Sequence, residues 1–282
     1  MTAFKSSSDK KGERPINAQI KNIIELCVQE NNLCTQETIK ENLSAAGFNM
    51  SQPTISRKLK RSDLSRKRVV HVPEERNSTR IINARYAFAS EINGISDEKL
   101  IYLDETGFNV HTNSTYGYSL RGAPAILQSP ANRGKNVSLI CAVSTIGVLA
   151  YETKTGGWNA DSFCTFITTM MAPAIRNANV EAPVLVMDNC KFHWSLSVRQ
   201  TLASHGIAIK YLPAYTPQLN PIEEFFSSLK HTYKQGERPR NTDEVIRKLK
   251  NIMDTTEFNI VPFYNHMRSY INQALARQPF LK

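Results

Sequence analysis

The chain has 282 residues, 41% of them apolar, and carries a formal net charge of +10 at pH 7. This size and composition are typical of a soluble globular protein with one large and one smaller domain. The longest weakly polar stretch, residues 137–151, falls short of the roughly 18 apolar residues that a membrane span needs, so we expect no contact with a membrane. The five cysteines never approach CxxC spacing, which argues against a zinc site.

The basic excess lies mainly at the N-terminal end. Residues 1–90 contain 16 Lys or Arg against 9 Asp or Glu. A regional excess of this kind is typical of a nucleic-acid binder, although a solvated basic face on an unrelated protein has the same composition. Residues 1–15 are rich in Lys, Ser and Gly and predict a flexible basic tail.

Residues 16–68 show three short helical patterns. Apolar residues recur at helical spacing in residues 20–28 and 39–46, and Gly47 ends the second segment. Ser51 can cap the third. Three short helices with a tight turn before the last one predict a small all-α helix-turn-helix domain.

The third helix has the residue types that contact DNA. Polar and basic side chains of a recognition helix meet base edges and phosphates in the major groove, and here the basic track continues past the helix. The candidate DNA-binding residues are Gln52, Thr54, Ser56, Arg57, Lys58, Lys60, Arg61, Arg66, Lys67 and Arg68. The alternative is a small helical bundle with a solvated basic face.

The composition changes twice after residue 68. Residues 69–97 hold one helical pattern among charged residues and predict a linker. Residues 98–240 contain short apolar runs bounded by Gly, Pro and Asn, which predict strands. The first of these strands follow one another directly, and the later ones alternate with helical patterns. This order predicts an α/β domain in which helices flank a mixed sheet. Residues 241–282 are expected to form a C-terminal helical segment.

Two aspartates directly follow predicted strands. Asp104 comes after residues 100–103 and Asp188 after residues 184–187, so we expect each to end its strand. Because strand ends converge on a cleft in α/β sheets, two carboxylates placed there can share a cation. Each aspartate can equally begin a turn, and neither is decisive alone.

A third acid follows a loop stiffened by prolines. In residues 212–221, Asn220 can cap a helix whose first turn holds Pro221. At about 100° per residue, the apolar stripe of that helix places Glu223 beside it and Glu224 nearly opposite. We expect Glu223 to reach the cleft and Glu224 to face water. The alternative is that Glu223 closes a capping box with Asn220.

The segments around these acids resemble, in their order, the catalytic blocks of a known family. They are Tyr102-Leu103-Asp104-Glu105-Thr106-Gly107-Phe108, Met187-Asp188-Asn189-Cys190-Lys191-Phe192-His193 and the segment from Leu212-Pro213 to Asn220-Pro221-Ile222-Glu223. The family is the mariner superfamily of DDE transposases, with the related bacterial insertion-sequence enzymes. The 34 residues between Asp188 and Glu223 are also similar to a common family spacing.

The resemblance implies a ribonuclease-H-like catalytic domain whose catalytic and metal-binding residues are Asp104, Asp188 and Glu223. The implied cofactor is Mg²⁺, with Mn²⁺ as a substitute, and Asp104 would bridge two ions. Two such ions activate the attacking oxygen and stabilise the leaving oxygen. Asn189 and His193 stay unassigned, and for His193 a structural role is favoured.

The resemblance also implies cut-and-paste transposition: DNA cleavage and strand transfer, with TA target sites. The expected partners are double-stranded DNA, as terminal inverted repeats and as target, and a second copy of the chain in a homodimer. The expected location is the nucleus in a eukaryote, or otherwise the cytoplasm with the nucleoid.

The chain departs from the family pattern in its DNA-reading part. Family members usually carry two helix-turn-helix units, whereas residues 16–68 supply one, which suggests a shortened element or a natural start further upstream. The main alternative function is a non-enzymatic DNA-binding protein derived from a transposase. A nuclease without joining activity is a third possibility.

Overall fold

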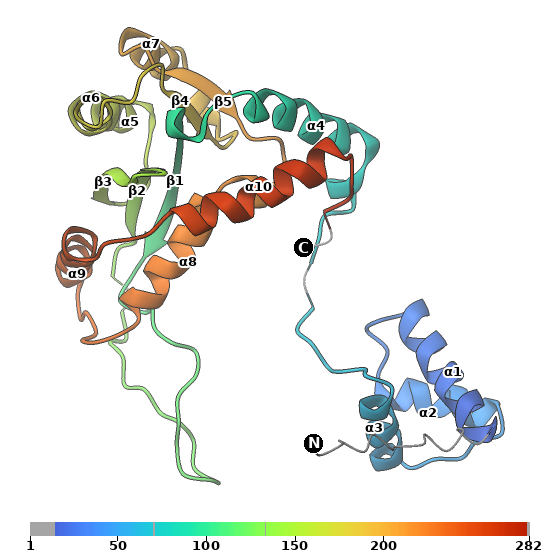
Figure 1. The fold of residues 1–282 in the computed structure, drawn as a ribbon. Helices are drawn as coiled ribbons and strands as arrows, with labels where there is room; N and C mark the ends of the chain where they lie inside the picture. Colours follow the sequence, from blue (N-terminus) through green and yellow to red (C-terminus); the bar gives the residue numbers. More distant parts are fainter. Residues whose placement is uncertain (1–14, 70, 133, 281–282) are drawn as a thin grey trace, which may run out of the picture. The chain divides into compact units, whose positions relative to one another are not determined.

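The computed structural model describes residues 15–69, 71–132 and 134–280. The chain divides into two compact units, one ending at His71 and the other beginning at Val72 (Figure 1). The tail predicted for residues 1–15 lies, except for Pro15, outside the described residues.

The first unit is a bundle of three helices, α1 (Pro15–Glu30), α2 (Gln36–Ala45) and α3 (Gln52–Arg61). Its small core consists of Ile20, Ile24, Cys27, Ile39, Leu43 and Ile55. Gly47 has a φ of +85°, a left-handed conformation that costs glycine little and lets the chain turn toward α3. The predicted all-α domain is therefore confirmed. The predicted cap differs, because the Ser51 hydroxyl bonds the Thr54 hydroxyl rather than a backbone amide.

The second unit is built on one sheet of five strands. The strands are β1 (Leu100–Phe108), β2 (Val137–Ser144), β3 (Gly147–Thr155), β4 (Val184–Met187) and β5 (Ala208–Tyr211). Their order is β3-β2-β1-β4-β5. Strand β2 is antiparallel to both of its neighbours, β1 and β3, whereas β4 and β5 are parallel to β1. The mixed sheet predicted from the sequence is confirmed.

Strand β1 is longer than predicted, and Asp104 lies in its middle rather than at its end. Residues 102–108 pair with β2 in the antiparallel register that sets Asp104 opposite Cys141. This pairing satisfies the backbone of the polar 104–107 segment, which a turn would otherwise have to do.

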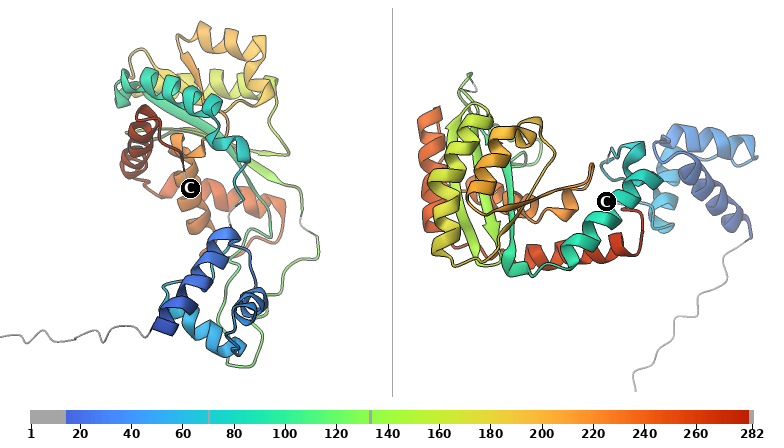
Figure 2. Two further views of the ribbon diagram at one scale, coloured as in Figure 1. Left: turned by 90° about the vertical axis from the view of Figure 1, so that its right-hand side faces the viewer. Right: turned by 90° about the horizontal axis from the view of Figure 1, so that it is seen from above.

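Helices cover both faces of the sheet (Figures 1 and 2). One face packs against α4 (Thr79–Asn93), α8 (Ile222–Tyr233), α9 (Thr242–Thr255) and α10 (Val261–Leu275). The other packs against α5 (Ala160–Phe166), α6 (Ala172–Asn177) and α7 (Leu196–Ser204). A π-helical turn, Ile167–Met171, joins α5 to α6. Because side chains alternate along a strand, Leu100 and Tyr102 enter the first layer and Ile101 and Leu103 the second.

Short 3₁₀ turns join several of these elements. They span Glu74–Asn77, Asp97–Lys99, Lys191–Trp194 and Pro217–Leu219. No helix among the described residues is long and apolar enough to cross a bilayer.

Helix α4 belongs to the second unit, although the sequence places it in a linker over residues 69–97. Phe88 and Ile92 are buried in the same core as the strands, and the helix packs along α10. Phe280 contacts α4 and the turn before it. Asn77 of that turn exchanges two hydrogen bonds with the backbone of Phe280, and Arg85 of α4 stacks on the Phe280 ring. The apolar stripe of α4 thus needs the cover that α10 supplies, and the structural boundary falls near residue 72.

Candidate active site

The pairing of β1 with β4 brings two predicted acids to one place. Leu100 pairs with Val184 and Tyr102 with Val186, both in parallel, so two residues further on Asp104 lies beside Asp188. Asp104 has the same strand parity as Tyr102 and therefore points to the face that α8 covers. Asp188 follows β4 directly, as predicted.

Asn220 connects the start of α8 to Asp104. Its amide nitrogen donates to Asp104 Oδ2 at 3.0 Å, and its amide oxygen accepts from the backbone N–H of Ile222 at 3.3 Å. Its own backbone N–H donates to the carbonyl of Pro217. A capping box with Glu223 would need that same N–H, so this alternative is excluded by the contacts that Asn220 makes.

The two neighbouring glutamates of α8 have different surroundings. Glu224, which was expected to face water, is half-exposed and also hydrogen bonds to His266 of α10. Glu223 is exposed by surface area, yet desolvation and the charge of Asp188 raise its pKa, while the charge of Lys230 lowers it. Glu223 is thus the glutamate of α8 whose charge acts on Asp104.

The electrostatics of Asp104 show how close these acids lie. Burial is the main reason that the pKa of Asp104 is raised to about 7, and the negative charges of Glu223, Glu105 and Asp188 add to the rise. A hydrogen bond from the Glu105 backbone N–H at 2.8 Å acts in the opposite direction and lowers the pKa. Carboxylates that raise one another's pKa favour a shared proton or a cation.

His193 is a residue of this site whose contacts the sequence did not predict. Its ring is 0% exposed. Nδ1 lies 2.8 Å from Asp188 Oδ1, and Nε2 faces Glu105 Oε1 at 3.4 Å. Burial acts to lower the pKa of His193, but the hydrogen bond to Asp188 and the nearby carboxylate of Glu105 outweigh it and raise the pKa to about 10. In turn, the bond from His193 lowers the pKa of Asp188.

The carboxylates of this site fit a divalent cation in their chemistry. Among the residues that the structure describes, no three His, Cys, Asp or Glu side chains form a ready group of metal ligands. Mg²⁺ and Mn²⁺ prefer carboxylate oxygens and keep several waters, so they need few protein ligands. Asp104, Asp188 and Glu223 are the side chains that would hold such an ion, and the mutual repulsion felt by Asp104 is what a cation would relieve.

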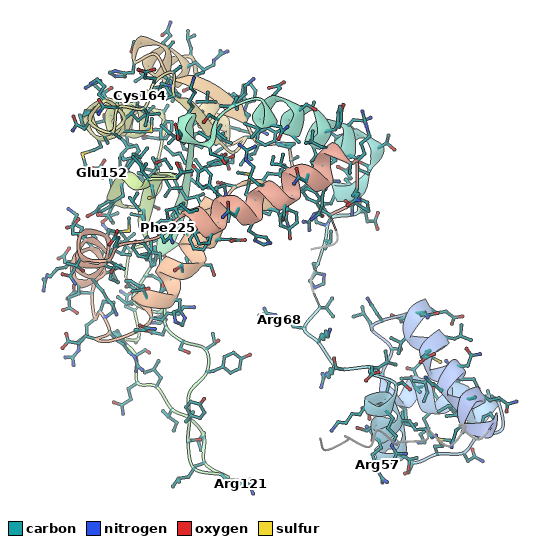
Figure 3. The ribbon with its side chains drawn as sticks, viewed as in Figure 1. Arg57, Arg68, Arg121, Glu152, Cys164 and Phe225 are labelled. Carbon is teal, nitrogen blue, oxygen red and sulfur yellow. The ribbon has the colours of Figure 1, made fainter. Side chains whose placement is uncertain are left out.

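The candidate DNA-binding residues lie on α3 and the segment after it. Gln52, Arg57, Lys60, Arg61, Arg66, Lys67 and Arg68 are exposed, whereas Thr54, Ser56 and Lys58 are half-buried. Lys58 donates to the Asn17 side chain of α1 at 3.1 Å, so part of its bonding capacity is used inside the unit. Figure 3 labels Arg57 on α3 and Arg68 on the extended segment that follows.

Comparison with known proteins supports the same assignment of the two units. Residues 99–246 match the family model described as DDE superfamily endonuclease. Residues 10–75 match the model described as the DNA-binding domain of arginine repressor. No curated protein matches the sequence.

Solved structures of Mos1 transposase have the same fold. The Mos1 paired-end complex with the left transposon end is 20% identical, with a TM-score of 0.75 over 99% of this chain and 84% of that chain. The Mos1 mariner paired-end complex with Mn gives the same values. The isolated Mos1 catalytic domain is 18% identical, with a TM-score of 0.56 over 76% of this chain and all of that chain. With the family model covering more than half of its length, the chain belongs to the DDE superfamily of endonucleases and has the fold of a mariner transposase.

Proposed function

We propose that this protein is a DNA transposase that cleaves DNA and joins the cut end to a target, with Asp104, Asp188 and Glu223 as its catalytic acids. The observation that carries the proposal is the convergence of these acids from β1, β4 and α8, where burial and their mutual repulsion raise the pKa of Asp104 to about 7. A non-enzymatic DNA-binding protein would have no need to keep three repelling carboxylates together.

The side chains around the acids have distinct tasks. Asp188 is kept ionised by its bond to the buried His193, so one ligand oxygen is charged at neutral pH. Asn220 fixes the orientation of Asp104 and the position of the α8 N-terminus, which carries Glu223. When bound, divalent cations would supply activation of the attacking oxygen and charge stabilisation on the leaving oxygen.

The proposal extends to partners and place of action. The Mos1 structures include paired-end complexes with transposon DNA and complexes with Mg or Mn. By analogy, we propose that this chain binds double-stranded DNA at terminal inverted repeats, acts as a homodimer that pairs two ends, uses Mg²⁺ or Mn²⁺, and inserts at TA sites. It would act in the nucleus of a eukaryote or at the nucleoid of a bacterium.

Cleavage assays with two neighbouring glutamates test the catalytic proposal. We expect Glu223→Gln to lower Mg²⁺-dependent nicking of duplex DNA that carries the repeats flanking the gene by at least about 100-fold, because it removes a charged ligand. Glu224→Gln, one residue away on the same helix, should cut within a few-fold of the wild type. Equal cutting by all three proteins, or none by any on verified ends, would contradict the proposal.

DNA binding by the first unit is tested on two exposed arginines. We expect Arg57→Ala with Arg61→Ala to weaken binding to the same repeats and to reduce its dependence on salt, because each arginine that meets a phosphate contributes about 0.9 to the slope of log K against log salt. The control pair Lys21→Ala with Lys40→Ala removes lysines that pair with Glu25 and Glu37. If both pairs weaken binding alike, α3 is not the recognition helix.

A further inference from the structure

A cavity of the second unit is lined by residues other than the three acids. It has a volume of about 1270 Å³ and opens between the base of the β1–β2 segment, residues 109–136, and the connection from α8 to α9. Its walls include Asn113 and Gln128 from the first of these and Gln235, Arg238 and Asn251 from the second side. The β1–β2 segment then extends away from the sheet, with Arg121 near its tip (Figure 3). We call this cavity the α8–α9 groove.

The groove is basic, and its positive charges are available. Arg238, Arg240, Arg247 and Lys248 line it, against two acids, Glu237 and Glu244. The three arginines are exposed, and among the described residues none of them forms a salt bridge. Unpaired arginines gathered along one groove are typical of a surface that meets an anion.

The other charged residues of the groove are engaged in shaping it. The Glu244 carboxylate accepts from the backbone N–H of Arg240 at 2.7 Å and from the Asn241 side chain at 2.9 Å, so it is held at the start of α9. Lys248 donates to the backbone carbonyls of Gln235 and Glu237, and thereby fixes the connection that carries Arg238. The arginines are therefore presented from a braced loop and from α9.

Helix α8 runs from the candidate active site to this groove. Its first turn carries Glu223, and Thr232 of its last turn lines the groove. At about 1.5 Å per residue these positions are roughly 14 Å apart. Lys230 lies between them on the Glu223 side, since its charge acts on Glu223, and its ammonium lies 5.8 Å from the Phe108 ring. One positive charge, that of Lys230, thus lies on α8 between the acids and the groove.

From these observations we propose that the α8–α9 groove binds the phosphodiester backbone of duplex DNA whose reacting end lies at the acids. A separation of roughly 14 Å corresponds to about four base pairs at ~3.4 Å each along one strand, so the groove would meet phosphates four or more base pairs from the cut. Flexible, exposed arginines suit phosphates rather than base edges, and bonds to phosphate position DNA without reading its sequence. The inference rests on the proposed function for the position of the DNA end.

Binding of the full-length protein to a 30-base-pair duplex of arbitrary sequence, followed by fluorescence anisotropy over a salt series without divalent metal, tests the groove. We expect Arg238→Ala with Arg247→Ala to weaken binding several-fold at low salt. The slope of log K against log salt should fall by about 0.9 for each phosphate that the variant no longer neutralises, for one or two phosphates.

Two further pairs serve as controls. The matched control, Arg176→Ala with Arg199→Ala, removes the same charge from exposed positions on α6 and α7 across the sheet and should keep the wild-type slope. Arg238→Lys with Arg247→Lys should also keep it, because neutralising a phosphate needs only the charge.

The outcomes separate the groove from the catalytic proposal. Equal weakening by the groove pair and the control pair would mean that only net charge matters and would overturn the inference, as would an unchanged slope in the groove pair. If the groove pair alone loses DNA affinity while the wild-type protein cuts no DNA, the groove is supported and the catalytic proposal is contradicted. If the groove pair keeps the wild-type salt slope and also cuts repeat-bearing DNA at the wild-type rate, the groove is contradicted and the catalytic proposal is supported. Melting curves of all variants show whether each one is folded.

Discussion

Asp104→Asn is expected to stabilise the metal-free protein against unfolding above about pH 4, by an amount that grows up to about pH 7 and is constant beyond it. The pKa of Asp104 lies near 3.8 in an unfolded chain but at about 7 in the folded protein, because the side chain is partly buried and lies near other carboxylates. Below both values the aspartate is neutral in both states and adds no penalty. As the pH rises through this window, ionisation favours the unfolded chain, so the wild type loses stability that asparagine keeps.

The size of this effect should be on the order of a few kcal/mol, since each pKa unit corresponds to about 1.4 kcal/mol. Thermal melting in EDTA at several pH values between 3.5 and 9 would measure it. Glu181→Gln, at an exposed position, serves as the control and should give a difference that does not change over this range. A pH-independent difference for Asp104→Asn would show that its carboxyl does not feel the neighbouring acids.

The same substitution connects stability to metal binding. In the wild type, Mg²⁺ added at pH 8 should raise the melting temperature, because a ligand that binds only the folded state stabilises it. In Asp104→Asn the rise should be smaller, because the central carboxylate is gone. Proton release on metal binding should increase as the pH falls through about 7, because Asp104 is half protonated there and already ionised at higher pH.

The sequence did not predict the full length of the strand that carries Asp104. A run of Asp104, Glu105, Thr106 and Gly107 has turn-like composition, and only pairing with β2 shows that it continues β1. The convergence of Asp104 with Asp188 depends on the parallel register of β1 and β4, two segments about 80 residues apart, which no local pattern specifies. The apolar stripe of α8, in contrast, is local, and its buried residues Ile222, Phe225, Phe226, Leu229 and Tyr233 are those that the sequence pattern predicted.

Helix α4 and His193 were harder to interpret from sequence for the same reason. The helical pattern of α4 was visible, but its burial depends on α10, which lies far along the chain. The burial of His193 is explained only in part by its neighbours in the sequence. Its partners are Asp188, five residues earlier, and Glu105, on the adjacent strand.

His193→Leu should destabilise the metal-free protein by roughly 1–3 kcal/mol near pH 6, because it leaves the half-exposed Asp188 and the partly buried Glu105 without their buried partner. The pKa of His193 is raised from 6.5 to about 10 by Asp188 and Glu105 despite its burial. A cation with a raised pKa adds stability fully below its unfolded value and loses it as the pH rises through the folded value. The destabilisation by leucine should therefore shrink between about pH 6.5 and pH 10.

Urea unfolding in EDTA at pH 6, 8 and 10 would measure this change, with His231→Leu, an exposed histidine, as the control. A loss of stability that does not vary with pH would assign His193 to packing alone. If the loss does vary, His193 is a buried cation that keeps Asp188 ionised while Asp104, without such a partner, retains its proton near neutral pH. Two carboxylates side by side would then have pKa values pushed in opposite directions, and Asp104 would be the one whose charge depends on a bound cation.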